Sequence, residues 1–169
     1  MQGTPAIYEF PPFFTKQINE QTWAAQKSNW EKICLNYCKG INQWTLNKNS
    51  PVFTNSRIQR TLPAPVILEL FNHMVEDGTA AWKIPNEEVY VYIKSPHLLA
   101  SELVSWTEAT GHSGAVITLF ELTNGDLSGL SSFESLDPGI LSQVLEIVFK
   151  QGNATEMRED GEVVGLKLK

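Results

Sequence analysis

Two cysteines four residues apart, Cys34 and Cys38, are the residues of this chain best suited by type to metal or redox chemistry. On one helical face their thiols would lie close together, but a structural zinc site takes four ligands, and the chain has no further cysteine and no histidine nearby in sequence. The N-terminus carries no secretory signal, so a disulfide is not expected. We predict that both cysteines are small buried residues on the inner face of a helix, and that the protein holds no metal and no cofactor.

The run Gly111-His112-Ser113-Gly114 sets a histidine beside a serine, the residue types of a nucleophilic catalytic site. It is one residue short of the Gly-x-Ser-x-Gly nucleophile elbow, and no strand is predicted before it. His73 lies on a predicted helix, where we expect it to be partly exposed and hydrogen-bonded to water. We therefore predict that the protein is not an enzyme; catalysis by His112 and Ser113 is an alternative that requires a pocket.

An aromatic and proline-rich segment near the N-terminus is suited to binding. Its members are Tyr8, Phe10, Pro11, Pro12, Phe13 and Phe14. Burying one Phe is worth about 1.5–3 kcal/mol, and a Pro-Pro pair loses little backbone entropy on entering an apolar groove. The segment either docks on a partner or folds back to complete its own small core, and composition leaves both open. A third possibility is a ligand for a WW-type domain, but the usual motif is Pro-Pro-x-Tyr, and here Phe14 stands where the tyrosine would be. If it docks, removing Phe13 and Phe14 should release the partner and leave the fold intact.

The elements that position these residues follow from helical and strand periodicity. Those of the first half are a helix from Asn19 that Gly40 stops, a short helix over 56–62, a helix from Pro65 to Gly78, and strands over 81–84 and 89–93. Those of the second half are a helix from Pro96 to Gly111, a strand over 115–118, a short helix from Thr118, a helix from Asp137 to Gly152, and strands over 154–157 and 163–168.

The two halves superimpose when the chain is shifted by 74 residues, which places Val66 on Ile140 and Gly78 on Gly152. Helix, stop glycine and hairpin agree together, so we predict a duplication. The shared order is that of a helix-turn-helix with a hairpin appended. The prediction is an α+β fold, a tandem repeat of two winged-helix domains (helix-strand-helix-helix-hairpin) over 19–94 and 95–169, preceded by an extended Pro/aromatic segment over 1–18.

The net charge of −6 argues against the function that a winged helix most readily suggests, DNA binding. The helix over 65–77 carries Glu69, Glu76 and Asp77 and no lysine or arginine, and its counterpart over 136–151 has a single lysine. Phosphates would repel such a recognition helix. We expect no direct binding to nucleic acid, and keep a tandem winged-helix nucleic-acid-binding protein as the alternative. No apolar run approaches the ~20 residues of a membrane span.

Four motifs carry a resemblance to a known family. They are Phe10-Pro11-Pro12-Phe13-Phe14-Thr15, Ser50-Pro51-Val52-Phe53, Ile58-Gln59-Arg60 with Leu62-Pro63, and Ile117-Thr118-Leu119-Phe120-Glu121-Leu122-Thr123-Asn124-Gly125. In this order, and over nearly the whole chain, the sequence resembles the small subunits of the ESCRT-II endosomal sorting complex. The resemblance implies a non-catalytic adaptor, present twice in a complex with one copy each of two larger subunits.

The resemblance also implies sites and a location. In that family the Pro-Pro-aromatic motif docks on a winged helix of each larger subunit, which carries over to Pro11, Pro12, Phe13 and Phe14, with Tyr8 and Phe10 as supports. The C-terminal winged helix recruits an ESCRT-III subunit during sorting of ubiquitinated cargo to multivesicular bodies, a role that residues 98–169 would take. A cytoplasmic protein recruited peripherally to endosomal membranes is implied, reaching the membrane only indirectly through the complex.

Overall fold

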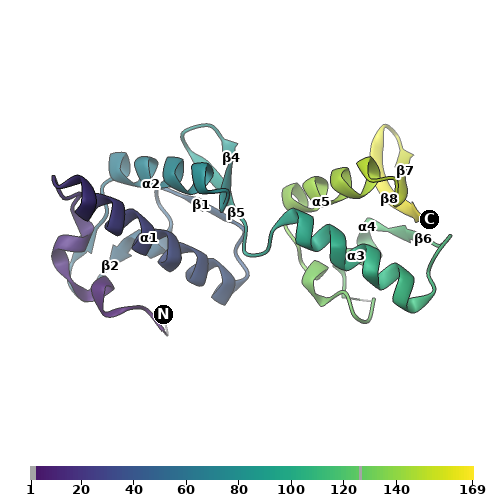
Figure 1. The fold of residues 1–169 in the computed structure, drawn as a ribbon, viewed down its shortest axis with the longest axis horizontal. Helices are drawn as coiled ribbons and strands as arrows, with labels where there is room; N and C mark the ends of the chain where they lie inside the picture. The colour runs from purple at the N-terminus through teal and green to yellow at the C-terminus, as the bar shows by residue number, and fades with distance from the viewer. Residues whose placement is uncertain (1–2, 126) are drawn as a thin grey trace. The chain divides into compact units, whose positions relative to one another are not determined.

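The computed structural model describes residues 3–125 and 127–169, and the chain divides into two compact units, Met1–Ile93 and Lys94–Lys169. Figure 1 shows both units, coloured from purple at the N-terminus to yellow at the C-terminus. Each unit combines helices with a three-stranded antiparallel sheet, which confirms the predicted α+β class. Among the described residues, no helix is long and apolar enough to cross a membrane.

The first unit packs two helices and an N-terminal segment around one core. Its elements are η1 (Ala6–Glu9), η2 (Pro11–Phe14), α1 (Glu20–Ile41), β1 (Thr45–Asn47), η3 (Pro51–Phe53), β2 (Thr54–Asn55), β3 (Arg60–Thr61), α2 (Ala64–Asp77), β4 (Ala80–Ile84) and β5 (Glu88–Val91). The larger sheet has the order β1-β5-β4, so the strand after the first helix pairs with the second strand of the hairpin. The sheet therefore ties α1 to the β4–β5 hairpin.

The second unit repeats the arrangement with a short helix added. Its elements are α3 (Pro96–Thr110), β6 (Val116–Thr118), α4 (Leu119–Thr123), η4 (Ser131–Phe133), α5 (Pro138–Lys150), β7 (Ala154–Glu159) and β8 (Glu162–Leu168). The sheet order β6-β8-β7 matches that of the first unit. Gly165 on β8 permits the close approach of β6, because a Cβ there would lie 2.6 Å from the carbonyl oxygen of Ile117.

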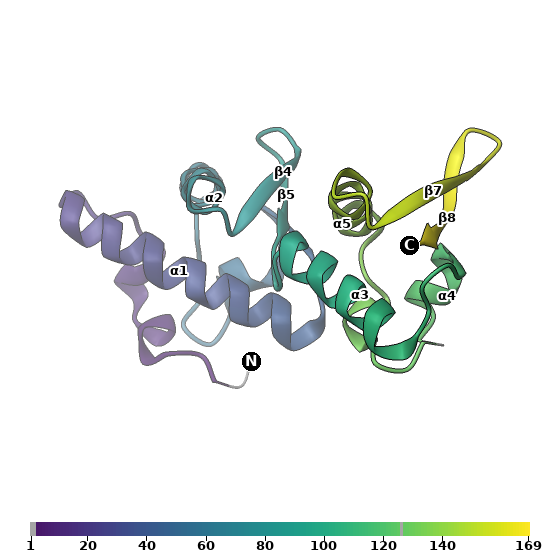
Figure 2. The same cartoon turned by 45° about the vertical axis from the view of Figure 1, so that its right-hand side comes forward.

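The N-terminal segment differs from the expectation that it is extended and separate from the first domain. It forms the two 3₁₀ turns η1 and η2, which lie beside α1 in both views (Figures 1 and 2). Tyr8, Phe13 and Phe14 are buried with the core residues of the first unit. The physical reason is that a domain this small buries too little apolar surface on its own.

Two further local predictions are wrong. Gly40 does not stop the first helix: α1 runs to Ile41, and Asn42 ends it in the left-handed region with φ 53°. Asparagine tolerates that conformation, so a glycine is not needed at the cap. Residues 56–62 form no helix. A two-stranded ladder of β2 and β3 replaces it, closed by a turn with Gln59 at φ 54°.

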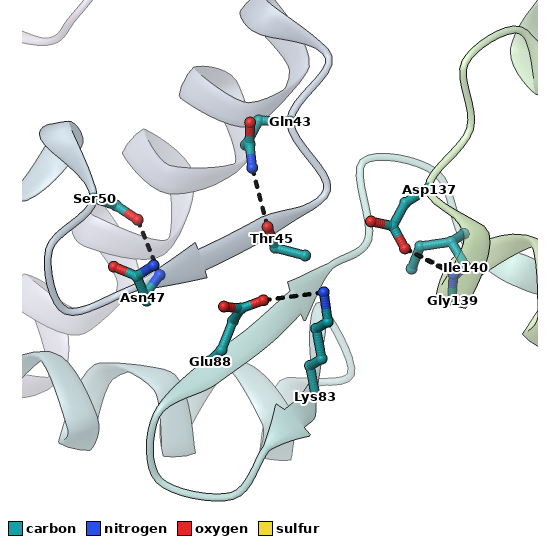
Figure 3. Close-up of polar contacts among 9 residues, drawn as sticks. All are labelled: Gln43, Thr45, Asn47, Ser50, Lys83, Glu88, Asp137, Gly139 and Ile140. Carbon is teal, nitrogen blue, oxygen red and sulfur yellow. Dashed lines mark hydrogen bonds and ion pairs between the residues drawn. The ribbon is translucent and has the colours of Figure 1, made fainter.

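Polar side chains fix the ends of the main elements. Asn19, Ser95 and Asp137 each accept hydrogen bonds from backbone N–H groups at the start of α1, α3 and α5. Figure 3 shows Asp137 with its two partners, the backbone nitrogens of Gly139 and Ile140. The same figure shows Lys83 and Glu88 paired at 3.2 Å across the β4–β5 hairpin. The order of elements thus follows from local signals that the sequence carries.

Candidate protein-interaction surfaces

Trp30 on α1 is the residue around which the N-terminal aromatic side chains gather. Phe13 stacks on its ring at 4.5 Å between centroids with an interplanar angle of 5°, and Phe14 meets it edge-on at 5.1 Å. The indole Nε1 donates a hydrogen bond to the carbonyl oxygen of Phe13, 3.1 Å away. Phe13 and Phe14 are each 2% exposed. Both residues therefore stabilise the first unit itself.

Tyr8 anchors the segment at its other end. Its hydroxyl donates to the carbonyl oxygen of Val52 at 2.8 Å, and the side-chain amide of Asn55 donates to the carbonyl oxygen of Tyr8 at 2.8 Å. Burial raises the pKa of Tyr8 to about 12. The hydroxyl thus stays protonated and acts as a donor throughout the neutral range.

Gln26 on α1 holds the segment in the middle, and sequence reasoning missed it. Its Oε1 accepts from the backbone nitrogen of Gln17 at 3.1 Å, and its Nε2 donates to the carbonyl oxygen of Thr15 at 3.0 Å. The side chain is buried with both polar ends paired. Its place one turn before Trp30, on the same helical face, is the sequence signal that could have identified it.

An exposed apolar edge remains between these anchors. Phe10 is 55% exposed, Pro12 is exposed and Pro11 is half-buried. Ile18, just before α1, is fully exposed, and sequence reasoning did not select it. Of the six predicted contact residues, the structure places Tyr8, Phe13 and Phe14 in the core and leaves Phe10, Pro11 and Pro12 accessible to a partner.

A groove of about 680 Å³ lies in the second unit, between α5 and the β7–β8 hairpin. Apolar residues of α5 form much of its lining, among them Leu141, Leu145 and the half-buried Phe149. Glu156 and Glu162 from the hairpin lie at the same groove. The stripe on α5 was predictable, but the groove was not, because it needs the hairpin folded beside the helix.

The candidate chemical residues do not form a catalytic constellation. Cys34 and Cys38 are fully buried, and burial raises the pKa of both thiols, that of Cys38 to about 12. His112 stacks on Trp106 at 4.4 Å between ring centroids, and its Nδ1 lies 2.6 Å from the Thr110 hydroxyl. The imidazole is thus held by its own helix end, while Ser113 is exposed in the loop.

Comparison with known proteins gives consistent matches. The family model for ESCRT-II complex subunits matches residues 7–137. Vacuolar protein-sorting-associated protein 25 of Schizosaccharomyces pombe is 33% identical over 97% of both chains, and that of Danio rerio is 31% identical over 89% of both. The crystal structure of subunit VPS25 of the endosomal trafficking complex ESCRT-II aligns with a TM-score of 0.89 at 26% identity, covering 99% of this chain and 100% of that one.

A second solved structure places a similar chain inside an assembly. The crystal structure of endosomal complex ESCRT-II (VPS22/VPS25/VPS36) contains a chain that aligns over its whole length, with a TM-score of 0.86 and 26% identity. The family model covers more than half of the present chain, and the similarity to the Schizosaccharomyces pombe relative extends over nearly all of it. The chain therefore belongs to the family of ESCRT-II complex subunits.

Proposed function

We propose that the chain is a non-catalytic adaptor subunit of ESCRT-II, built from two winged-helix domains over 19–94 and 95–169. The observation that carries the proposal is the whole-length similarity to the VPS25 chain of the solved complex, whose other subunits are VPS22 and VPS36. The order of helix, strand, helix and hairpin with the strand order first-third-second in both units supports the winged-helix assignment. Two copies join one copy each of the two larger subunits.

The N-terminal segment docks on the larger subunits through its exposed edge, Phe10, Pro11 and Pro12. The buried aromatics Tyr8, Phe13 and Phe14 act indirectly, because they hold that edge in one conformation against α1. A fixed edge loses less conformational entropy on binding than a free tail would. Phe10 supplies the aromatic anchor, a residue type enriched where binding energy concentrates.

Co-purification with the larger subunits tests this docking. Phe10→Asp should weaken recovery of the complex strongly and leave the fold of the isolated chain unchanged, since the side chain is 55% exposed. Phe120→Asp is the matched control, because Phe120 is a 71% exposed phenylalanine in the other unit. Normal recovery of the complex by Phe10→Asp would refute docking through this edge.

The C-terminal domain recruits an ESCRT-III subunit during sorting of ubiquitinated cargo to multivesicular bodies. The groove beside α5 is the surface we assign to this contact, since it has an apolar floor formed by Leu141, Leu145 and Phe149. At its edge Glu146 pairs with Lys150 and Glu156 with Arg158. The apolar face of an amphipathic helix complements that floor. The chain acts in the cytoplasm at endosomal membranes, which it reaches indirectly through the complex.

Binding of the ESCRT-III subunit to the intact complex tests the groove. Phe149→Asp should abolish binding while assembly with the larger subunits persists, because Phe149 is half-buried and lines the groove. Phe120→Asp again serves as control, because Phe120 does not line the groove. Unchanged binding by a folded Phe149→Asp variant would rule out this surface and leave the adaptor assignment itself standing.

A further inference from the structure

Three side chains with metal-binding donor atoms meet between α1 and α2. Glu31 comes from α1, while His73 and Asp77 lie one turn apart near the end of α2. His73 Nε2 lies 3.8 Å from Glu31 Oε1 and 3.6 Å from Asp77 Oδ2. One donor atom from each of the three falls within 4.8 Å of the other two.

The imidazole of His73 is partly exposed, as the sequence predicts, but its Nε2 atom is enclosed. Its side chain is 20% exposed, and the Nε2 atom is enclosed without a hydrogen-bond partner among the described residues. Buried nitrogen atoms of this kind are normally satisfied, since an unpaired polar atom costs about 1–3 kcal/mol in stability. The atom instead points at two carboxylates at distances longer than a hydrogen bond.

The ion pairs recorded for the two carboxylates lie within the cluster. In the part of the chain that the structure describes, the recorded ion pairs of Glu31 and Asp77 are with His73 and none is with a lysine or arginine. The last turn of α2 carries no basic residue, although a helix C-terminus favours positive charge. Asp77 therefore places a carboxylate at a helix end that disfavours negative charge.

We propose that Glu31, His73 and Asp77 bind one divalent transition metal ion, with zinc the best match. An imidazole nitrogen with two carboxylate oxygens is a donor set that zinc accepts, whereas calcium and magnesium prefer oxygen alone. Tetrahedral bonds of about 2.0–2.1 Å place the donor atoms roughly 3.3 Å apart. The separations of 3.6 and 3.8 Å from His73 need a small inward movement, and the two carboxylate oxygens, which lie within 4.8 Å of each other, must also approach. Water completes the fourth position.

A neighbouring hydroxyl already orients one of these ligands. Thr79 Oγ1 donates to Glu31 Oε2 at 2.8 Å, which leaves Oε1 as the oxygen nearest His73. Such contacts to the far side of a ligand fix its direction and are worth tenfold to a hundredfold in metal affinity. Bound metal would connect α1 to α2, so the site stabilises the first unit and is independent of the proposed adaptor role.

Zinc titration of the full-length chain, stripped of metal and followed by calorimetry, tests the site. We expect one saturable site, weakened at least tenfold by His73→Gln and by Asp77→Asn, and weakened tenfold to a hundredfold by Thr79→Val. His97→Gln is the matched control, because His97 is an exposed histidine of the other unit, and it should bind as the parent chain does. Equal affinity in a folded His73→Gln variant, or no saturation at roughly millimolar zinc, would overturn the proposal.

Three further measurements keep the test independent of folding. Far-UV circular dichroism checks each variant, and Asp77→Asn carries the test if His73→Gln misfolds, since the Asp77 side chain is 52% exposed. Cobalt substituted for zinc should give a ligand-field spectrum without thiolate charge transfer. A thiolate band would place the metal on Cys34 or Cys38 and refute the proposed ligands. Zinc should also raise the melting temperature of the parent chain and leave that of His73→Gln unchanged.

Discussion

Replacing Phe13 with alanine tests whether the N-terminal segment is part of the first unit's core. Phe13 is 2% exposed and stacks on Trp30 at 4.5 Å. Truncating a buried phenylalanine typically costs about 3–5 kcal/mol, from lost burial and from the cavity left behind. Since whole domains are stable by only about 5–15 kcal/mol, Phe13→Ala should remove a large share of the stability of this unit.

Phe10→Ala provides the matched comparison, because it removes the same side chain three residues earlier at a position 55% exposed. Exposed substitutions usually change stability by less than about 0.5 kcal/mol. Adding Phe14→Ala to Phe13→Ala should deepen the loss. We expect the double variant to lose its partners because its first unit unfolds, since both rings are buried. The burial therefore argues against the expectation that its fold stays intact.

Native-state hydrogen exchange is the suitable assay, because a chain of two units need not unfold in a single step. In Phe13→Ala, the amides of α1 should exchange faster by a factor that corresponds to about 3–5 kcal/mol, while those of α5 keep their protection as an internal reference. Unchanged protection of α1 would refute the reasoning, since the aromatic cluster would then contribute nothing to the unit.

Three other predictions concern the pair Gly165 and Gly40, then Cys38, then Tyr8. Gly165→Ala should destabilise the second unit by about 1–3 kcal/mol, since its Cβ would lie 2.6 Å from the Ile117 carbonyl oxygen. Gly40→Ala should stabilise the first unit by about 0.5–1 kcal/mol, because open space surrounds this position in α1. Thermal melts should show a lower melting temperature for the first variant and a higher one for the second. Alkylation of Cys38 at neutral pH should be far slower in the folded chain than in urea, as mass spectrometry can measure, because burial raises its pKa to about 12. Burial raises the pKa of Tyr8 from 10.0 to about 12, so the protonated hydroxyl contributes stability below pH 10, on the order of 2 kcal/mol, that is lost as the pH rises towards 12. Urea midpoints measured across that window should therefore fall less in Tyr8→Phe than in the parent chain. An equal fall in both would contradict the assignment.

Much of the fold was predictable because its signals are local. Ser95 caps α3, Thr118 caps α4 and Asp137 caps α5, each within a few residues of the helix it begins. The apolar stripes of α2 and α5 have one spacing, so the repeat could be read from the chain alone. The short helix expected over 56–62 failed because strand pairing between Thr54 and Thr61 decided that segment.

The sites were predictable only in part, because they join residues that are distant in sequence. Composition indicated that the N-terminal aromatics need an apolar partner, but nothing local selects Trp30 for Phe13 or Val52 for Tyr8. The same holds for His73, whose neighbour Glu31 lies on another helix. The i, i+4 spacing of His73 and Asp77 can be read from the sequence, but nothing local indicates that Glu31 will face them.

The N-terminal segment shows why burial and docking need not be alternatives. Its buried aromatics fix a short proline-containing edge, and a fixed edge binds with a smaller loss of entropy than a free peptide. The same residues that stabilise the first unit thereby determine how Phe10 and Pro12 are displayed. If a substitution of Phe13 or Phe14 releases a partner, the cause is therefore the loss of the core that holds the segment in place. Only a substitution at the exposed edge tests the contact itself.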